Sequence, residues 1–250
     1  ATDPLIKYIY INTDKASLSI SQCEDLRKAL KKFRASGKAI VAYGSSFATG
    51  SYYIASVADK VIMDVNGSVQ IFGISSNILF LKDLLDKVGL KMQLIRHGKY
   101  KSAAEQYIRN DISDENREQN QEMINSLWNA LAQDIADSRG FTTEEFNSWI
   151  DELELYNNQK YMEHHIVDDI LYMDELKSYL CNLSDLDKFK DINFVSLADY
   201  ASVAVDNSSK EKNTIAILYA EGEIVLKGTK EGEIDANKYV REIEKIRTDS

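Results

Sequence analysis

The sequence predicts an α/β fold in which a parallel sheet is flanked by helices and carries a helical arm. Short apolar, β-branched segments alternate with segments of helical periodicity, as in proteins whose parallel strands are connected by helices. Residues 101–138 have helical spacing without strand patterns, and the helices from Ser113 onward predict the arm. The single proline, Pro4, imposes few breaks on these helices. With 44% hydrophobic residues among 250, the chain can bury a sizeable core.

The elements of the first hundred residues alternate as this fold requires. We expect strands over residues 5–11, 39–43, 60–63, 69–72 and 92–95. Ser21 and Glu24 predict a capping box for a helix that closes near Gly37. Further helices are expected from residues 49–51 and over 79–88, and turns at 44–46 and 66–67.

The remaining elements are mainly helical. Within the arm, Met123, Leu127, Leu131 and Ile135 recur every four residues, and Gly140 follows its end. Thr142 and Glu145 predict the start of another short helix. A strand over 214–218, a turn at 221–222 and a helix over 234–247 repeat the order of residues 5–34, which suggests a tandem duplication.

The polar segment 206–213 is the best candidate linker, so we predict a first domain over 1–205 and the start of a second over 214–250. The chain opens almost directly on a strand, without a methionine, and ends where a βαβ pattern would place the next strand. We therefore expect it to be a piece of a longer protein.

Composition excludes several classes of protein. Lys and Arg total 30 against 40 Asp and Glu, and the net charge of −10 argues against nucleic-acid binding. No run of eighteen apolar residues could span a bilayer. Cys23 and Cys181 are too few for a disulfide framework or a four-cysteine zinc site.

Lys101 follows a predicted strand and precedes a predicted helix. The positive end of the helix dipole disfavours a charged amine, so a desolvated lysine here could act as a general base. The alternative is a solvated surface lysine, which composition alone favours.

Other candidate groups carry less specific signals. Thr49 and Ser51 could supply a nucleophilic hydroxyl at a strand-to-helix turn, although an N-cap role is favoured and no Gly-x-Ser-x-Gly elbow is present. Glu163, His164, His165, Asp168 and Asp169 could hold a metal, but adjacent histidines diverge on a helix, which favours a polar face. No Ser-His-Asp triad can be inferred around His97, and no Gly-x-Gly-x-x-Gly or Walker loop indicates nucleotide binding.

Three segments resemble the N-terminal domain of the long, tandem-repeat form of signal peptide peptidase A, or protease IV. The segments are residues 48–60, residues 67–73, and above all Gly98-Lys99-Tyr100-Lys101-Ser102-Ala103-Ala104-Glu105 followed by Ile108-Arg109-Asn110-Asp111. The similarity covers most of residues 1–205 and implies a fold like that of Clp protease and the crotonases.

The resemblance implies a membrane-associated bacterial serine endopeptidase that degrades cleaved signal peptides. It assigns Lys101 as the general base of a Ser/Lys dyad whose serine comes from the second domain, beyond residue 250. Thr49 stands where the second domain keeps its serine, and residues 12–16 replace the oxyanion-binding glycine loop, so residues 1–250 alone should be inactive. The lysine would become competent only when the second domain covers it.

The same resemblance implies partners and location. Peptide substrates, a homo-oligomer such as a tetramer, no cofactor, and a periplasmic site on the bacterial inner membrane are expected, with the membrane anchor outside this chain. Two alternatives remain: a crotonase-like domain that binds acyl-CoA through backbone N–H groups, or a scaffold for oligomerisation. In both, Lys101 would be dispensable.

Overall fold

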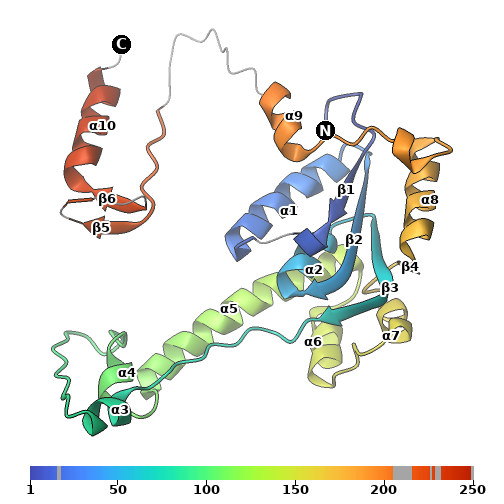
Figure 1. Cartoon of the computed structure of the whole chain (residues 1–250). Helices are drawn as coiled ribbons and strands as arrows, with labels where there is room; N and C mark the ends of the chain where they lie inside the picture. The colour runs from blue at the N-terminus through green and yellow to red at the C-terminus, as the bar shows by residue number, and fades with distance from the viewer. Residues whose placement is uncertain (16–17, 205–215, 226, 229–231, 249–250) are drawn as a thin grey trace. The chain divides into compact units, whose positions relative to one another are not determined.

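The computed structural model describes residues 1–15, 18–204, 216–225, 227–228 and 232–248 (Figure 1). The chain divides into two compact units, Ala1–Ile192 and Asn193–Ser250. The predicted linker, 206–213, lies outside the described residues.

A four-stranded parallel sheet, in the order β1-β2-β3-β4, forms the centre of the first unit. Its strands are β1 Tyr8–Asn12, β2 Ala39–Ala48, β3 Lys60–Gln70 and β4 Asp169–Leu171. Because parallel strands need long connections, each of the three crossovers carries at least one helix. The predicted parallel sheet is confirmed.

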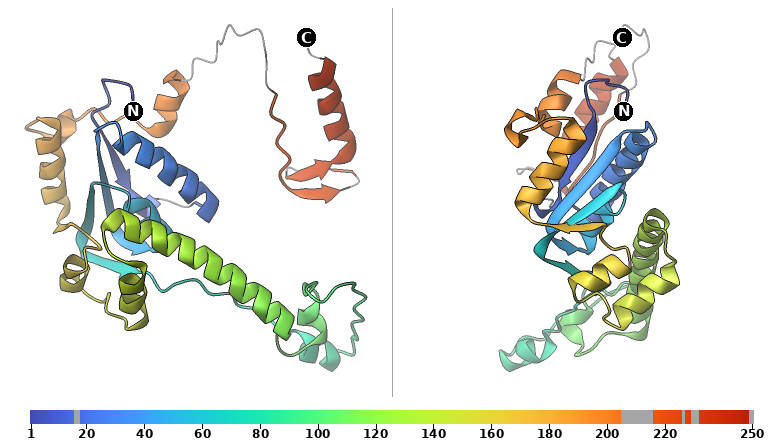
Figure 2. Two further views of the ribbon diagram at one scale, coloured as in Figure 1. Left: turned by 180° about the vertical axis from the view of Figure 1, so that it is seen from behind. Right: turned by 90° about the vertical axis from the view of Figure 1, so that its right-hand side faces the viewer.

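Both faces of this sheet are buried by helices (Figures 1 and 2). Helices α1 Ile20–Arg34, α2 Thr49–Ala55 and α5 Asp114–Arg139 pack on one face, and α8 Met173–Ser184 packs on the other. Within β2, Ile40 and Ala42 join the first layer, whereas Val41 and Tyr43 join α8. This alternation places successive side chains on opposite faces, and burial on both faces explains the nearly continuous apolar sequence of β2.

Shorter helices complete the unit. Helices α6 Thr143–Asp151 and α7 Asn158–Glu163 follow α5, while α3 Lys82–Lys87 and α4 Glu105–Ile108 lie at the opposite end of α5, away from the sheet (Figure 2). Short 3₁₀ turns cover Thr13–Lys15 and Phe189–Asp191. We call α3, α4 and the segments joining them, residues 78–113, the arm tip. Helix α5 is the predicted helical arm.

Two predicted turns lie inside strands instead. Strand β2 continues through residues 44–46 with a register shift between Gly44 and Ser46, and β3 continues through 66–67. A Cβ at Gly44 would lie 2.5 Å from Thr13 Oγ1, so the backbone here passes too close to its neighbour for any other residue. The glycine indicates close packing rather than a chain reversal.

Other predicted boundaries also shift. Residues 92–95 form no strand within the part of the chain that is described, and Ile95 is 90% exposed, because no neighbouring strand is there to accept its hydrogen bonds. The predicted helix over 101–138 is split into α4 and α5. The capping box of α1 uses Ser19 and Gln22, whereas the box at Thr142 and Glu145 is confirmed.

The second unit contains α9 Leu197–Ala204, a parallel pair β5 Glu223–Val225 and β6 Glu233–Asp235, and α10 Ala236–Thr248. The turn predicted at 221–222 is present, with Gly222 at φ +122°. Residues 216–218 lie outside any strand, and residues 214–215 of the predicted strand are not among those described. The C-terminal helix begins two residues later than predicted.

Candidate functional site

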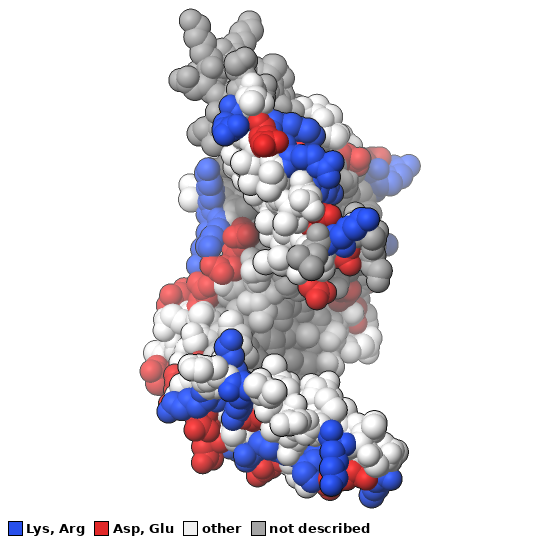
Figure 3. Space-filling view, turned by 90° about the vertical axis from the view of Figure 1, so that its left-hand side faces the viewer, with Lys and Arg blue, Asp and Glu red and all other residues white. Residues whose placement is uncertain are grey.

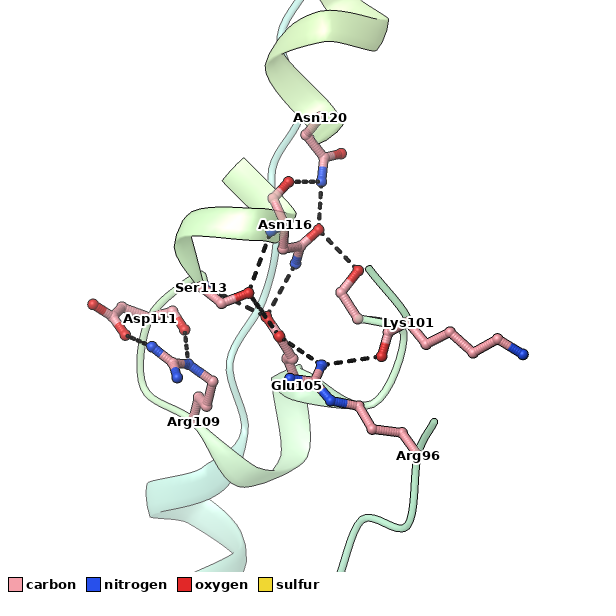
Figure 4. A network of polar contacts seen from close by, with 9 residues as sticks. Arg96, Lys101, Glu105, Arg109, Asp111, Ser113, Asn116 and Asn120 are labelled. Carbon is pink, nitrogen blue, oxygen red and sulfur yellow. Dashed lines mark hydrogen bonds and ion pairs between the residues drawn. The ribbon is translucent and has the colours of Figure 1, made fainter. Parts of the chain in front are cut away.

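Lys101 lies in the segment that leads into α4, at the arm tip. Its backbone N–H donates to the Gly98 carbonyl at 3.4 Å, and Gly98 adopts φ +96°, a conformation that favours glycine. The side chain is exposed, and among the described residues its ammonium has no hydrogen-bonding or ion-pair partner. In Figure 4 it extends away from the polar network beside it.

That network is centred on the carboxylate of Glu105, the first residue of α4. Only 2% of the Glu105 side chain is exposed, and Arg96 donates to Oε1 at 2.9 Å. The Ser113 hydroxyl lies 2.7 and 2.8 Å from the two carboxylate oxygens, and its backbone N–H donates at 3.3 Å. Asn116 Nδ2 adds a further donor at 3.3 Å.

These donors determine the ionisation of Glu105. Burial alone raises the pKa of the carboxyl, because it disfavours the charged form. The hydrogen bonds from Ser113, Arg96 and Asn116 outweigh burial and lower the pKa to about 2. Glu105 is therefore a buried carboxylate that carries its charge at neutral pH.

The local sequence explains how this cluster forms. Ser113 is the N-cap of α5, and its Oγ accepts from the Asn116 N–H at 3.3 Å, so the cap orients both residues toward α4. Arg109 donates to the Asp111 carbonyl and carboxylate in the short connection between the two helices. The chain thus reverses direction after α4 and returns the start of α5 to the Glu105 carboxylate.

A separate cavity of about 510 Å³ lies at the carboxyl ends of β1 and β2. Parallel α/β sheets commonly bind ligands at this edge. Its lining includes Thr13, Asp14, Ser45, Ser46 and Ser51.

Polar groups that line this cavity already form hydrogen bonds within the protein. Asp14 Oδ1 accepts from the Ser45 backbone N–H at 2.8 Å, and Ser51 Oγ donates to the Ala48 carbonyl at 3.0 Å. An oxyanion hole needs free N–H groups and no adjacent negative charge. The Asp14 carboxylate takes one such N–H group and brings a negative charge into the cavity.

Thr49 begins α2, but its expected N-cap role is wrong. Ala48 is the N-cap residue, and no side chain caps this helix start. Thr49 and Lys101 are not brought together, because α2 packs on the sheet and the lysine segment lies at the far end of α5 in all views (Figures 1 and 2). The first unit therefore does not assemble a nucleophile and a base from its own candidates.

The residues considered for a metal site have other contacts. His164 Nε2 lies 2.9 Å from Glu154 Oε2, and its ring stacks on Trp149 at 4.2 Å between centroids. Asp168 pairs with Arg139 at 2.8 Å. No group of three or more His, Cys, Asp or Glu residues with metal-binding geometry occurs among the described residues.

Comparison with known proteins provides an independent test of these interpretations. The sequence model of peptidase family S49 matches residues 32–187, more than half of the chain and including the whole lysine segment. The chain belongs to peptidase family S49. This membership agrees with the family resemblance carried by Lys101 and its flanking residues.

Relatives within the S49 family are considerably longer. The chain is 27% identical to Protease 4 of Haemophilus influenzae over 233 residues, which cover 89% of this chain and 38% of that protein. It is 28% identical to the chloroplastic serine protease SPPA of Arabidopsis thaliana, with 90% and 33% covered, and 30% identical to Protease 4 of Salmonella typhi, with 79% and 33% covered. This S49 chain thus spans about a third of the length of these three relatives.

Two solved structures resemble this S49 chain at low identity. A mutant of ClpP1 from Listeria monocytogenes has a TM-score of 0.36 and 10% identity, with 68% of this chain and 93% of that chain covered. An enoyl-CoA hydratase/carnithine racemase from Magnetospirillum magneticum has a TM-score of 0.39 and 12% identity, with 84% and 73% covered. Because both TM-scores are below 0.5, no residue role is transferred from either protein.

Sequence reasoning missed the role of Glu105 and its partners. Glu105 is part of the motif that carries the family resemblance, and Ser113 precedes an acidic helix start, which is a recognisable N-cap signal. Neither signal reveals that the cap and the carboxylate bind each other.

In the part of the chain that is described, no helix is both long and apolar enough to cross a membrane.

Proposed function

We propose that this chain supplies the general base of a Ser/Lys peptidase and that Lys101 is that base. The nucleophilic serine is contributed by a domain outside residues 1–250, and the substrates are cleaved signal peptides or other short peptides. The observation that carries the proposal is an exposed, unpaired amine on a well-hydrogen-bonded segment of an S49 chain.

The exposure of Lys101 requires a second surface for this chemistry. A lysine acts as a general base near neutral pH only when burial lowers its pKa, and the surroundings of Lys101 in this chain do not bury it. The arm tip has the character of a surface that is covered in the assembled protein, because Leu79 is 70%, Val88 62% and Leu90 56% exposed.

Charge supports the same interpretation. Residues 82–101 contain six Lys and Arg against two Asp, whereas the whole chain has a net charge of −10. Basic side chains lie beside uncharged surface at this end of the first unit (Figure 3). A second domain or a second copy, arranged in a homo-oligomer at the bacterial inner membrane on its periplasmic side, would bury the lysine together with these apolar residues.

The cavity at the sheet edge counts against the acyl-CoA alternative. A crotonase-like reaction needs backbone N–H groups that polarise a thioester carbonyl, and Asp14 already accepts from the Ser45 N–H there. We therefore assign the proposed peptidase function to the arm tip rather than to this cavity.

The test is the Lys101→Ala variant of the full-length protein, assayed with a fluorogenic peptide. We expect kcat to fall by roughly 100-fold or more, the usual contribution of a general base, with thermal unfolding unchanged because the side chain has no partner among the described residues. Lys99→Ala is the matched control, because Lys99 is exposed two residues earlier and should keep its activity. Wild-type turnover by Lys101→Ala would refute the assignment.

A further inference from the structure

We propose that Glu105 is a positioning residue that fixes the backbone of Lys101 for catalysis, and this inference rests on the role proposed above for Lys101. Glu105 is buried and would act through the segment that carries the lysine.

The burial of Glu105 is maintained by specific hydrogen bonds and does not result from packing alone. Helix α4 has four residues and makes little core, so packing alone does not require a charged side chain to be enclosed there. A carboxylate removed from water is tolerated only when its oxygens are hydrogen bonded. Here Arg96 supplies those bonds from one segment, and Ser113 and Asn116 supply them from the start of α5.

The cluster is joined to the Lys101 carbonyl (Figure 4) and to the side chain of the next residue, Ser102. The Arg96 guanidinium donates to Glu105 Oε1 and, from the same nitrogen, to the Lys101 carbonyl at 3.1 Å. In addition, the Ser102 hydroxyl donates to Asn116 Oδ1 at 3.0 Å. Asn116 in turn donates to Glu105, so one carboxylate orders both groups that hold the chain at Lys101 and Ser102.

The network holds the backbone of Lys101 and leaves its ammonium without a partner among the described residues. The amine is therefore available to a nucleophile outside this chain, while its attachment point is fixed by hydrogen bonds to the Lys101 carbonyl and to the Ser102 side chain. Catalytic geometry is sensitive at this scale, since a misplacement of about 1 Å can lower a rate by roughly 100-fold. A loss of Glu105 should consequently affect the rate of the chemical step and not the binding of the peptide.

The experiment compares Glu105→Gln with wild type in the full-length protein. Glutamine has the same shape but cannot accept from Arg96 and from Ser113 with a full negative charge. We expect kcat to fall about 10-fold or more while KM changes by less than about 3-fold, and we expect amide hydrogen exchange over residues 98–104 to accelerate. Unchanged kcat and unchanged exchange would overturn the inference.

Two further variants keep the test decisive. Ser102→Ala removes one link to the lysine segment without uncovering a buried charge, so it should fold and lower kcat by a smaller factor, even where Glu105→Gln fails to fold. Asp86→Asn is the matched control, because Asp86 forms an exposed ion pair with Lys82 in the same arm tip and should leave kcat unchanged.

The outcome with Lys101→Ala separates this inference from the proposed function. Full activity of Lys101→Ala would refute the proposed function and, with it, the positioning role. An inactive Lys101→Ala combined with wild-type kcat in both Glu105→Gln and Ser102→Ala would refute the positioning role alone. A fall in kcat that is equal in Asp86→Asn would indicate general damage to the arm tip and would also refute it.

Discussion

Glu105 stays ionised although it is almost completely buried, because hydrogen bonds from its neighbours replace those that the carboxylate would make with water. Its carboxylate accepts from a guanidinium, a hydroxyl, a backbone N–H and an amide. Bonds of this kind involve a charged acceptor and are about twice as strong as those between neutral groups. The charge therefore stabilises the arm tip only while the carboxyl remains deprotonated.

A pH dependence of stability follows from this ionisation. The pKa of Glu105 falls from an ordinary value of 4.5 to about 2 in the folded protein, so protons bind the unfolded chain more readily. The contribution of Glu105 should be complete above pH 4.5 and should disappear as the pH falls from 4.5 to about 2. Urea unfolding of wild type and Glu105→Gln across this range measures it.

The comparison between the two proteins isolates Glu105, because all other carboxylates titrate in both. The difference in the free energy of unfolding should be largest at neutral pH and should shrink below pH 4.5. A difference that stays constant down to pH 2.5 would mean that the charge of Glu105 contributes nothing to folding.

At the level of elements, α5 connects the sheet with the arm tip. Its C-terminal half is buried through Leu131, Ala132 and Ile135, and its start contributes Asn116 to the Glu105 cluster. The 15 residues from Asn116 to Leu131 correspond to about 22 Å of helix. One continuous helix thus anchors at the sheet and presents the lysine segment at a distance from it.

The anchored end of α5 is fixed by Arg27 of α1. This side chain is buried and donates to the Ser56 hydroxyl at 2.7 Å, to the Ser138 hydroxyl at 2.6 Å, and to the carbonyls of Tyr53 and Asp134. It therefore joins three helices at one point.

Replacing Arg27 should be costly. Removal of one partner from a buried charged network leaves its other members unpaired, and we expect Arg27→Ala to lower the free energy of unfolding by about 3 kcal/mol. Lys31→Ala is the control, since Lys31 pairs with the same Asp134 at 3.1 Å but is exposed, and its loss should cost less than about 1 kcal/mol. Equal, small losses in urea denaturation would contradict the anchoring role.

Hydrophobic periodicity correctly predicted the elements that are buried in the sheet or against it. The strand at residues 39–43, the helix that contains Leu26, Leu30 and Phe33, and the spacing of Leu131 and Ile135 all correspond to buried faces. The strand expected at 92–95 was wrong, because its apolar residues lie at the arm tip without a neighbouring strand in the described part of the chain. An apolar pattern predicts burial, but the described part of the chain offers Ile95 no surface that buries it.

The candidate site was predicted less completely than the fold. Lys101 was identified through a family motif, and its role remains a prediction. The Glu105 cluster could not be predicted, because it depends on side chains from 96, 105 and 113–116 meeting after the chain reverses at Arg109 and Asp111. Local sequence specifies each helix start, but it does not specify which side chains meet between them.

For the whole molecule, the separation of Thr49 from Lys101 predicts that residues 1–250 have no peptidase activity. At the sheet edge, the Asp14 carboxylate already accepts from the Ser45 N–H. The Lys101 side chain is exposed, and no described residue covers its amine. The purified chain should therefore neither cleave a fluorogenic peptide nor react with a fluorophosphonate probe.

The full-length protein serves as the positive control for both assays. Turnover by residues 1–250, or labelling of Thr49 by the probe, would show that the sheet edge is a working active site. Either result would shift the chemistry from the arm tip to the cavity beside Asp14.

Because α5 is one continuous helix, its length determines how far the Lys101 amine lies from the sheet. Deleting seven residues from its middle would retract the tip by about 10 Å and, because seven residues make nearly two full turns, would keep it facing in nearly the same direction. Neither the anchor at Arg27 nor the cluster at Glu105 lies within that stretch. The distance from the sheet to the lysine can thus change through the length of α5. The contacts that stabilise each end of the helix need not change with it.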